Sequence, residues 1–167
     1  TLAPETLVSL DESLPPAWSH GNPVDVLGDA RPKRFAKAVE IVLADKGGEA
    51  VLTIVTPQAM TNPSGTAREL AALAERTPKP ILAAFLGGAT MREAMRTLAA
   101  AGVASYATPE EAVKAFMTLV AYARNLEILY ETPRELPVRL AGEPATLRQQ
   151  AAALMPEGVT TLSETAA

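Results

Sequence analysis

The sequence predicts an α/β fold built around a parallel sheet of four or more strands. Four segments of the chain share one order: a short apolar run, a loop containing Gly, Pro, Thr or Asn, and a stretch with apolar residues at helical spacing. Repeated units of this kind place their strands in parallel, because each helix returns the chain to the same end of the sheet. We therefore expect helices on both faces of one twisted sheet.

The first two units carry the clearest signals. The first is expected to form a strand over residues 24–27 and a helix over 32–45, where apolar residues recur at helical spacing. In the second, residues 50–55 are apolar on both faces, as a central parallel strand requires. Asn62, immediately before Pro63, predicts the N-cap of the following helix.

The other two units repeat the pattern. A strand over residues 81–86 is followed by a Gly87-Gly88 turn and a helix. A short strand over residues 103–106 precedes a long helix, which Thr108 and Glu111 open as a capping box.

Outside these units the chain is poorer in core material. We expect one domain over residues 1–132, which begins with a short helix over residues 4–10. Residues 133–167 are expected to form a linker and one small helix, over residues 144–154.

Composition excludes several classes of function. The chain has no cysteine and one histidine, which removes disulfides, thiolate nucleophiles and Cys- or His-based metal sites. A net charge of -4 and 4% aromatic residues argue against nucleic-acid binding. No run of about twenty apolar residues is present to span a bilayer, so we expect a soluble, cytoplasmic protein. The chain does not begin with Met, and we expect it to be part of something longer.

Two polar loops are the candidate functional sites. Residues 21–30 and 55–63 lie where expected strands give way to helices, the place at which open α/β sheets bind ligands. The second loop runs into a helix start, whose free N–H groups attract phosphate or carboxylate. It adds the hydroxyls of Thr56 and Thr61 and the amide of Gln58, which helix capping does not need.

Other polar residues have competing explanations. His20 is exposed and could act in acid–base or phosphoryl chemistry, but a loop histidine without a catalytic role is favoured. Asp25 and Asp29 could hold Mg²⁺ or a hydroxyl, although such residues more often bond loop N–H groups. Gly87-Gly88 permits either close backbone approach or a tight turn. No P-loop, G-x-G-x-x-G, G-x-S-x-G or H-E-x-x-H pattern is present.

Several segments, in order, resemble the C-terminal α/β domain of the acyl-CoA synthetase (NDP-forming) superfamily, which includes ADP-forming acetyl-CoA synthetases and succinyl-CoA synthetase. The resemblance covers residues 1–133, and these segments carry it: His20-Gly21-Asn22-Pro23-Val24-Asp25-Val26-Leu27-Gly28-Asp29-Ala30, Thr56-Pro57-Gln58-Ala59-Met60-Thr61, Phe85-Leu86-Gly87-Gly88, Tyr106-Ala107-Thr108-Pro109-Glu110-Glu111-Ala112-Val113 and Tyr122-Ala123-Arg124-Asn125. It implies a flavodoxin-like, three-layer α/β/α fold within a larger protein.

The resemblance also implies roles for residues. In this family a histidine receives a phosphoryl group from an acyl phosphate and passes it to a nucleotide, between helix N-termini of two flavodoxin-like domains. This chain resembles the domain that supplies one such helix, and Asn22 matches an asparagine near the acyl substrate. The implied substrate- or phosphate-binding residues are Asn22, Thr56, Pro57, Gln58, Ala59, Thr61 and Asn62, with Asp25, Gly87 and Gly88 as secondary candidates.

The family's phosphorylated histidine belongs to a preceding domain, so the resemblance implies no catalytic residue, metal site or bound cofactor in this chain and no turnover by it alone. The parent is expected to be an ADP-forming acid–CoA ligase that uses CoA, ADP or ATP and Mg²⁺. Expected partners are a CoA-binding, phosphohistidine-bearing domain, an ATP-grasp domain, and a small carboxylate or phosphate. Two alternatives remain: a synthetase-like regulatory domain of a protein lysine acetyltransferase, and a docking module without catalysis.

Overall fold

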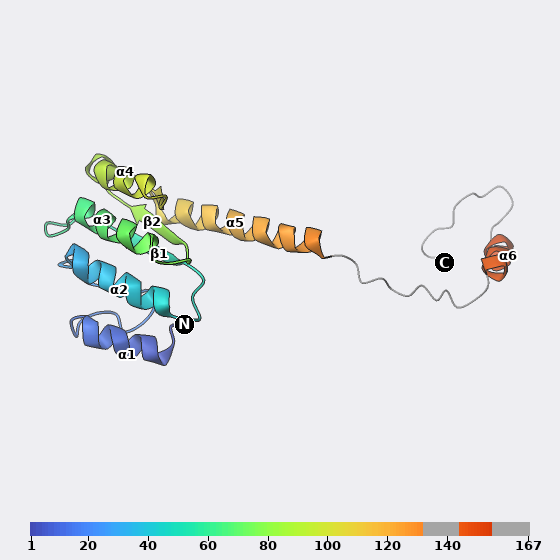
Figure 1. The fold of residues 1–167 in the computed structure, drawn as a ribbon, viewed down its shortest axis with the longest axis horizontal. Coiled ribbons are helices and arrows are strands. Elements are labelled where there is room, and N and C mark those ends of the chain that lie inside the picture. The colour runs from blue at the N-terminus through green and yellow to red at the C-terminus, as the bar shows by residue number, and fades with distance from the viewer. Residues whose placement is uncertain (132–143, 155–167) are drawn as a thin grey trace. The chain divides into compact units, whose positions relative to one another are not determined.

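A computed structural model describes residues 1–131 and 144–154 and shows an α/β architecture (Figure 1). Its contacts divide the chain into two units, Thr1–Asn125 and Leu126–Ala167. The sheet and all candidate site residues lie in the first unit. The sequence-based division after residue 132 stays a prediction.

Helices and strands alternate along the first unit. In chain order the elements are α1 (Pro4–Ser13), α2 (Pro32–Ala44), β1 (Val51–Val55), α3 (Pro63–Ala74), β2 (Ile81–Phe85), the 3-10 turn η1 (Gly88–Met91), α4 (Arg92–Ala100), β3 (Ala104–Tyr106) and α5 (Pro109–Tyr130), whose last turns belong to the second unit. The second unit also holds α6 (Pro144–Leu154), which confirms the predicted small helix. The predicted linker over residues 133–142 lies outside the described residues.

The described sheet is parallel, in the order β1-β2-β3. Val51 is paired with Ile81, and Leu82 with Ala104. The parallel α/β class is confirmed, and the strands expected in the second, third and fourth units are present. The described residues contain three strands, however, and not the four or more that were predicted.

The missing strand is the first one, and its prediction was wrong. Residues 24–27 are extended but join no sheet. Two backbone N–H groups that could pair with a neighbouring strand are bound by side chains instead. Ser19 Oγ accepts from Asp25 N–H at 2.9 Å, and Asp25 Oδ1 accepts from Leu27 N–H at 2.8 Å. Leu27 also has a φ of 70°, which no strand residue adopts.

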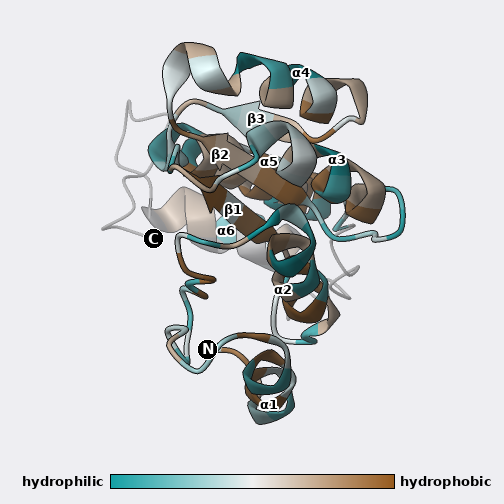
Figure 2. Ribbon diagram, turned by 90° about the vertical axis from the view of Figure 1, so that its left-hand side faces the viewer, coloured by the Kyte–Doolittle hydropathy of each residue, from teal (hydrophilic) through white to brown (hydrophobic). Residues whose placement is uncertain are grey.

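One face of the sheet carries the main core, which we call the sheet cluster (Figure 2). Helices α2, α3 and α4 pack side by side over this face. The largest fully buried side chains of this cluster are Phe85, Leu70, Met91 and Leu98. The apolar spacing in the helices therefore gives the packing that the sequence predicts.

The opposite face of the sheet meets only the start of α5 among the described residues. Leu52 and Leu82 of the sheet and Phe116 of α5 line a shallow apolar hollow on this side. Helices thus lie on both faces, which confirms the three-layer arrangement. The cover is incomplete, because Ile54 of β1 remains 47% exposed.

Local signals in the sequence set the helix ends. Asn62 caps α3, because its side chain accepts from Gly65 N–H at 2.9 Å. Thr108 Oγ1 accepts from Glu111 N–H at 3.3 Å, as the capping box predicts. The Glu111 carboxylate reaches one residue further back than expected and accepts from Ala107 N–H.

A second apolar cluster joins α1 to α2. Leu10, Leu14, Trp18 and Ala38 form its buried centre, and we call it the α1–α2 cluster. Asp45, buried at the end of α2, fastens the same pair of helices by accepting from Ala3 N–H at 2.8 Å. Within the described residues, no helix is long and apolar enough to cross a membrane.

Candidate functional site

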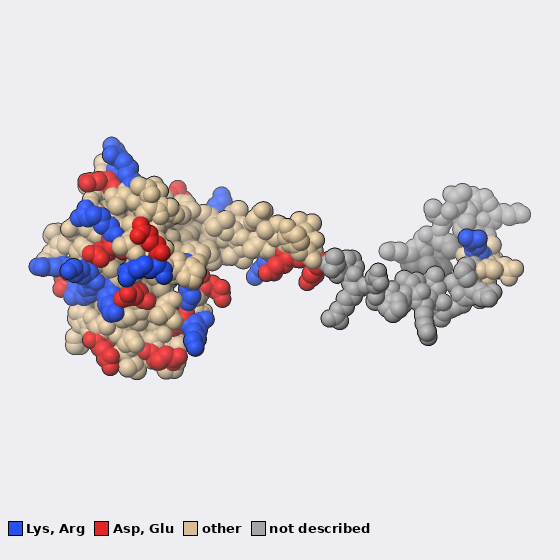
Figure 3. All heavy atoms as spheres, viewed as in Figure 1, with Lys and Arg blue, Asp and Glu red and all other residues tan. Residues whose placement is uncertain are grey.

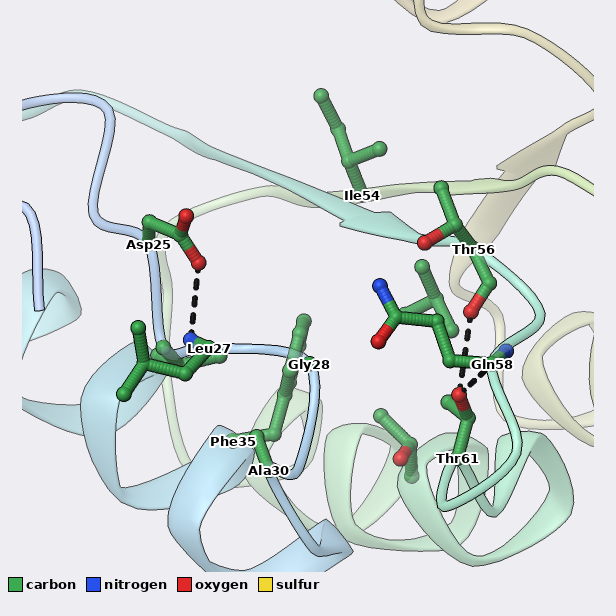
Figure 4. Close-up of a pocket in the computed structure, with 12 residues that line it drawn as sticks. Asp25, Leu27, Gly28, Ala30, Phe35, Ile54, Thr56, Gln58 and Thr61 are labelled. Carbon is green, nitrogen blue, oxygen red and sulfur yellow. Dashed lines mark hydrogen bonds between the residues drawn. The ribbon is translucent and has the colours of Figure 1, made fainter.

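The two loops predicted as functional sites lie on opposite sides of one pocket (Figure 4). The pocket has a volume of about 120 Å³. Residues 25–28 line one wall, and residues 54–56 with Gln58 line the other. Ala30, Phe35 of α2, Thr61 and Thr66 of α3 complete the lining. The carboxyl end of β1 thus holds a pocket, as open α/β sheets lead one to expect.

Gln58 bridges the two loops. Its side chain points across the pocket toward the first loop (Figure 4). The contact with Gly28 is so close that a Cβ on this glycine would lie 1.9 Å from Gln58 Oε1. Only glycine lets the two loops approach in this way.

Thr61 holds the second loop in shape. Its hydroxyl accepts from Gln58 N–H at 2.8 Å and donates to Thr56 O at 3.3 Å, while its own N–H donates to Gln58 O at 3.1 Å. The side chains of Thr61 and Asn62 are therefore engaged within the loop and the helix cap. Their predicted role as ligand groups stays a prediction, and their observed role is to fix the backbone.

This bonding leaves one group of donors available. The backbone N–H groups of Ala59, Met60, Asn62 and Ser64 have no hydrogen-bond partner within residues 1–131 and 144–154. Pro63 has no N–H to offer. Ala59 and Met60 are exposed, so the turn before α3 presents donors to solvent at the positive end of a helix dipole.

Charge distinguishes this turn from the pocket itself. Asp25 is the only charged residue in the pocket lining, and its carboxylate accepts from Leu27 N–H. A carboxylate there repels an anion. On the face drawn in Figure 3, acidic and basic side chains are intermixed, with several Lys and Arg side chains gathered toward the left edge. Arg34 of α2 is paired with Asp29 of the first loop.

The structure brings together some of the predicted site residues and leaves others apart. Thr56, Gln58, Thr61 and Asp25 line the pocket. Asn22, Pro57, Ala59, Asn62, Gly87 and Gly88 do not. Asn22 is exposed and precedes a cis peptide bond to Pro23.

The loop that follows β2 contacts the second loop through Gly87. A Cβ on Gly87 would lie 3.1 Å from Pro57 Cγ, and the φ of this residue is 141°. Gly87 therefore allows both a tight turn and a close approach of the backbone, the two possibilities that the sequence suggested.

Thr66 and Phe35 line the pocket but were not predicted as site residues. Both lie on helix faces whose residue spacing predicts packing in the core. Only the packing of the helices against each other brings them to the pocket.

His20 lies outside the pocket lining and has structural partners. Its Nδ1 is 2.8 Å from Asp11 Oδ1 and its Nε2 is 2.9 Å from Pro16 O. Its ring lies against Trp18 in a tilted arrangement, with the ring centroids 4.8 Å apart. The carbonyl of Pro16 and the Asp11 carboxylate raise the pKa of His20, because both favour the doubly protonated ring. These contacts favour the loop role over catalysis.

Within the described residues, no group of three or more His, Asp or Glu side chains could hold a metal ion. The pocket is also smaller than the 300 Å³ or more that nucleotide-sized ligands typically occupy. A small group, such as a phosphoryl or carboxylate, fits this loop cluster better than a nucleotide does.

Comparison with known proteins gives a consistent set of relatives. The model of the Ligase-CoA domain family matches residues 2–129. The chain is 34% identical over 120 residues to the ADP-forming acetate–CoA ligase I of Archaeoglobus fulgidus, and 30% identical over 126 residues to the alpha subunit of the ADP-forming acetate–CoA ligase I of Pyrococcus furiosus. Each match covers 72% of this chain, which spans 17% and 26% of the two relatives.

Solved structures show the same fold. The dinucleotide forming acetyl-coenzyme A synthetase 1 of Ca. Korarchaeum cryptofilum, in complex with phosphate and ADP, matches with a TM-score of 0.70 and 27% identity. The match covers 80% of this chain and 30% of that chain.

Proposed function

Because the chain belongs to the Ligase-CoA domain family, we propose that it serves as one domain of an ADP-forming acid–CoA ligase. Such an enzyme interconverts acyl-CoA, ADP and phosphate with a carboxylate, CoA and ATP. The relatives from Archaeoglobus and Pyrococcus are acetate–CoA ligases, and their names support acetate as the carboxylate.

The part of this domain in the reaction is to stabilise a phosphoryl group. The observation that carries the proposal is the set of free N–H groups on Ala59, Met60, Asn62 and Ser64 at the start of α3. Preorganised donors of this kind stabilise the charge of a phosphoryl group in transfer and need no rearrangement when it arrives. Thr61 contributes by fixing the turn.

The phosphoryl group is expected to sit at the exposed turn and not inside the pocket, because the Asp25 carboxylate faces the pocket. The phosphorylated histidine, CoA and the nucleotide with its Mg²⁺ would be held by other domains of the parent. Partner domains of the CoA-binding and ATP-grasp types follow from the family resemblance.

Titration of the isotope-labelled chain with inorganic phosphate tests this site. We expect NMR shifts confined to the amides of Ala59, Met60, Asn62 and Ser64. Shifts scattered over Lys and Arg residues, or no shifts at the turn, would contradict the proposal.

In the parent enzyme, Ala59→Pro removes one of these N–H groups at a turn position that suits proline. We expect enzyme phosphorylation to slow by about tenfold or more. Ala59→Gly keeps the N–H and serves as the matched control. An Ala59→Pro enzyme that folds and is phosphorylated at the normal rate would rule out a role for this amide.

The comparisons give no support to the two alternatives, an acetyltransferase regulatory domain and a docking module. The relatives described above are CoA ligases.

A further inference from the structure

β1 lies at the edge of the described sheet but has the composition of a central strand. One side of β1 has no neighbouring strand among the described residues. Its sequence, Val-Leu-Thr-Ile-Val, contains neither a charge nor a proline, which are the usual means of protecting an exposed edge. An edge of this kind readily pairs with another extended segment.

The hydrogen bonds of β1 identify the groups at its free edge. Val51 N–H donates to Pro80 O, and Val55 O accepts from Leu86 N–H, so the odd-numbered residues face β2. Backbone groups of successive strand residues point to opposite sides. The N–H and C=O groups of Leu52 and Ile54 therefore point to the free edge, which offers two donors and two acceptors.

A second extended segment runs beside this edge. Residues 25–28 and the carboxyl end of β1 line the same pocket (Figure 4). Val24 and Val26 pack against the α1–α2 cluster, as inward-facing strand residues do. Between the two extended segments there is a pocket, lined by Val26 and Leu27 on one side and by Ile54 on the other, in place of a hydrogen-bonded ladder.

We propose that an extended apolar strand, supplied by a part of the parent protein outside residues 1–167, occupies this position between β1 and residues 24–27. It would run parallel to β1, as the other strands of this sheet do. Strand addition of this type binds through main-chain hydrogen bonds and side-chain pockets. The relatives are long enough to supply the segment, since this chain spans only 17% of the Archaeoglobus ligase.

Such a strand also explains why the apolar core is divided. The sheet cluster and the α1–α2 cluster are separate groups of buried residues. A strand at this position would place side chains between the two clusters and would bury Ile54. This inference requires a longer parent protein and does not depend on the reaction that the parent catalyses.

Hydrogen exchange at single-residue resolution tests the proposal, with the 167-residue chain and the full parent compared at equal pH. We expect the amides of Leu52 and Ile54 to exchange about a hundredfold more slowly, or slower still, in the parent. The amide of Thr53 faces β2 and is the internal control, protected in both proteins. Equal exchange of Leu52 and Ile54 in the two proteins would overturn the proposal. So would protection in the isolated chain that increases with its concentration, because a second copy would then fill the position.

A proline substitution gives an independent test. Proline is tolerated at an edge position whose N–H has no partner but not at one within a ladder. Ile54→Pro should therefore lower the melting temperature of the parent by more than that of the isolated chain. Thr53→Pro, which removes an N–H facing β2, should destabilise both. Equal losses for Ile54→Pro in the two proteins would count against the added strand.

Discussion

The side chain of Gln58 packs directly against the backbone of Gly28: a Cβ at position 28 would lie 1.9 Å from Gln58 Oε1. These residues are thirty positions apart, and each follows an apolar extended segment. Both residues line the pocket between the two loops. Substitutions at these two positions test how the two loops meet.

We expect Gly28→Ala to displace the Gln58 side chain and to lower the free energy of unfolding by less than about 1 kcal/mol. The cost is small because the end of a flexible side chain can move away from the new methyl group. Urea unfolding measures this, with Gln58→Ala as the second variant. The double variant should be no less stable than Gln58→Ala alone, and a large additional loss would mean that the loops contact each other differently.

Gly65→Ala should lower the free energy of unfolding by more than Gly28→Ala does, by about 1–3 kcal/mol. A Cβ on Gly65 would lie 2.7 Å from Pro32 Cγ, where α2 and α3 are in contact, and the proline ring cannot move away as Gln58 can. The loss is expected although alanine favours a helix by about 1 kcal/mol over glycine. Pro32→Ala in the same chain should recover part of the stability, and a neutral Gly65→Ala would contradict the close contact.

Asn62→Ala removes the cap of α3 and should lower the free energy of unfolding by about 1 kcal/mol. Asn62→Asp keeps the acceptor oxygen and should stay near the natural stability. Thermal unfolding of both variants checks the order. Equal stability of all three proteins would show that the cap contributes little.

His20 makes stability depend on pH near neutrality. The Pro16 carbonyl and the Asp11 carboxylate raise the pKa of His20 above its usual 6.5, so the folded protein binds the proton more tightly than the unfolded chain. This contribution is complete below about pH 6.5 and is lost as the pH rises through the folded pKa. An NMR titration of the ring gives the pKa, and Asp11→Asn should bring it down. A pKa at or below 6.5 in the natural chain would contradict the contacts.

Asp45 makes stability depend on pH in the acid range, and here stability is lost as the pH falls. Hydrogen bonds from Ala3 N–H, the Thr6 hydroxyl and Gly47 N–H lower the pKa of Asp45 below 3.8. Its contribution to stability is present above about pH 4 and is lost as the pH falls through the lower folded pKa. Asp45→Asn should be less stable at pH 7 and should lose less stability between pH 5 and pH 2. Parallel pH profiles for the two proteins would argue against this role.

The sequence by itself determined the local elements. The cap at Asn62, the capping box at Thr108 and the helical spacing of apolar residues predicted α3 and α5, because these features involve contacts within a few positions of each other. The strands β1 and β2 were predicted from uninterrupted apolar runs, since a buried parallel strand is apolar on both faces.

Only the tertiary structure decided whether residues 24–27 are a strand and which loops meet at the site. A strand exists only when another strand pairs with it, and that partner is distant in sequence. The same holds for Gln58 against Gly28 and for Thr66 in the pocket wall, which depend on how separate elements pack. The sequence located the turn before α3 that offers free N–H groups. Only the fold showed that the Thr61 side chain holds this turn by hydrogen bonds and that the Asp25 carboxylate lines the pocket.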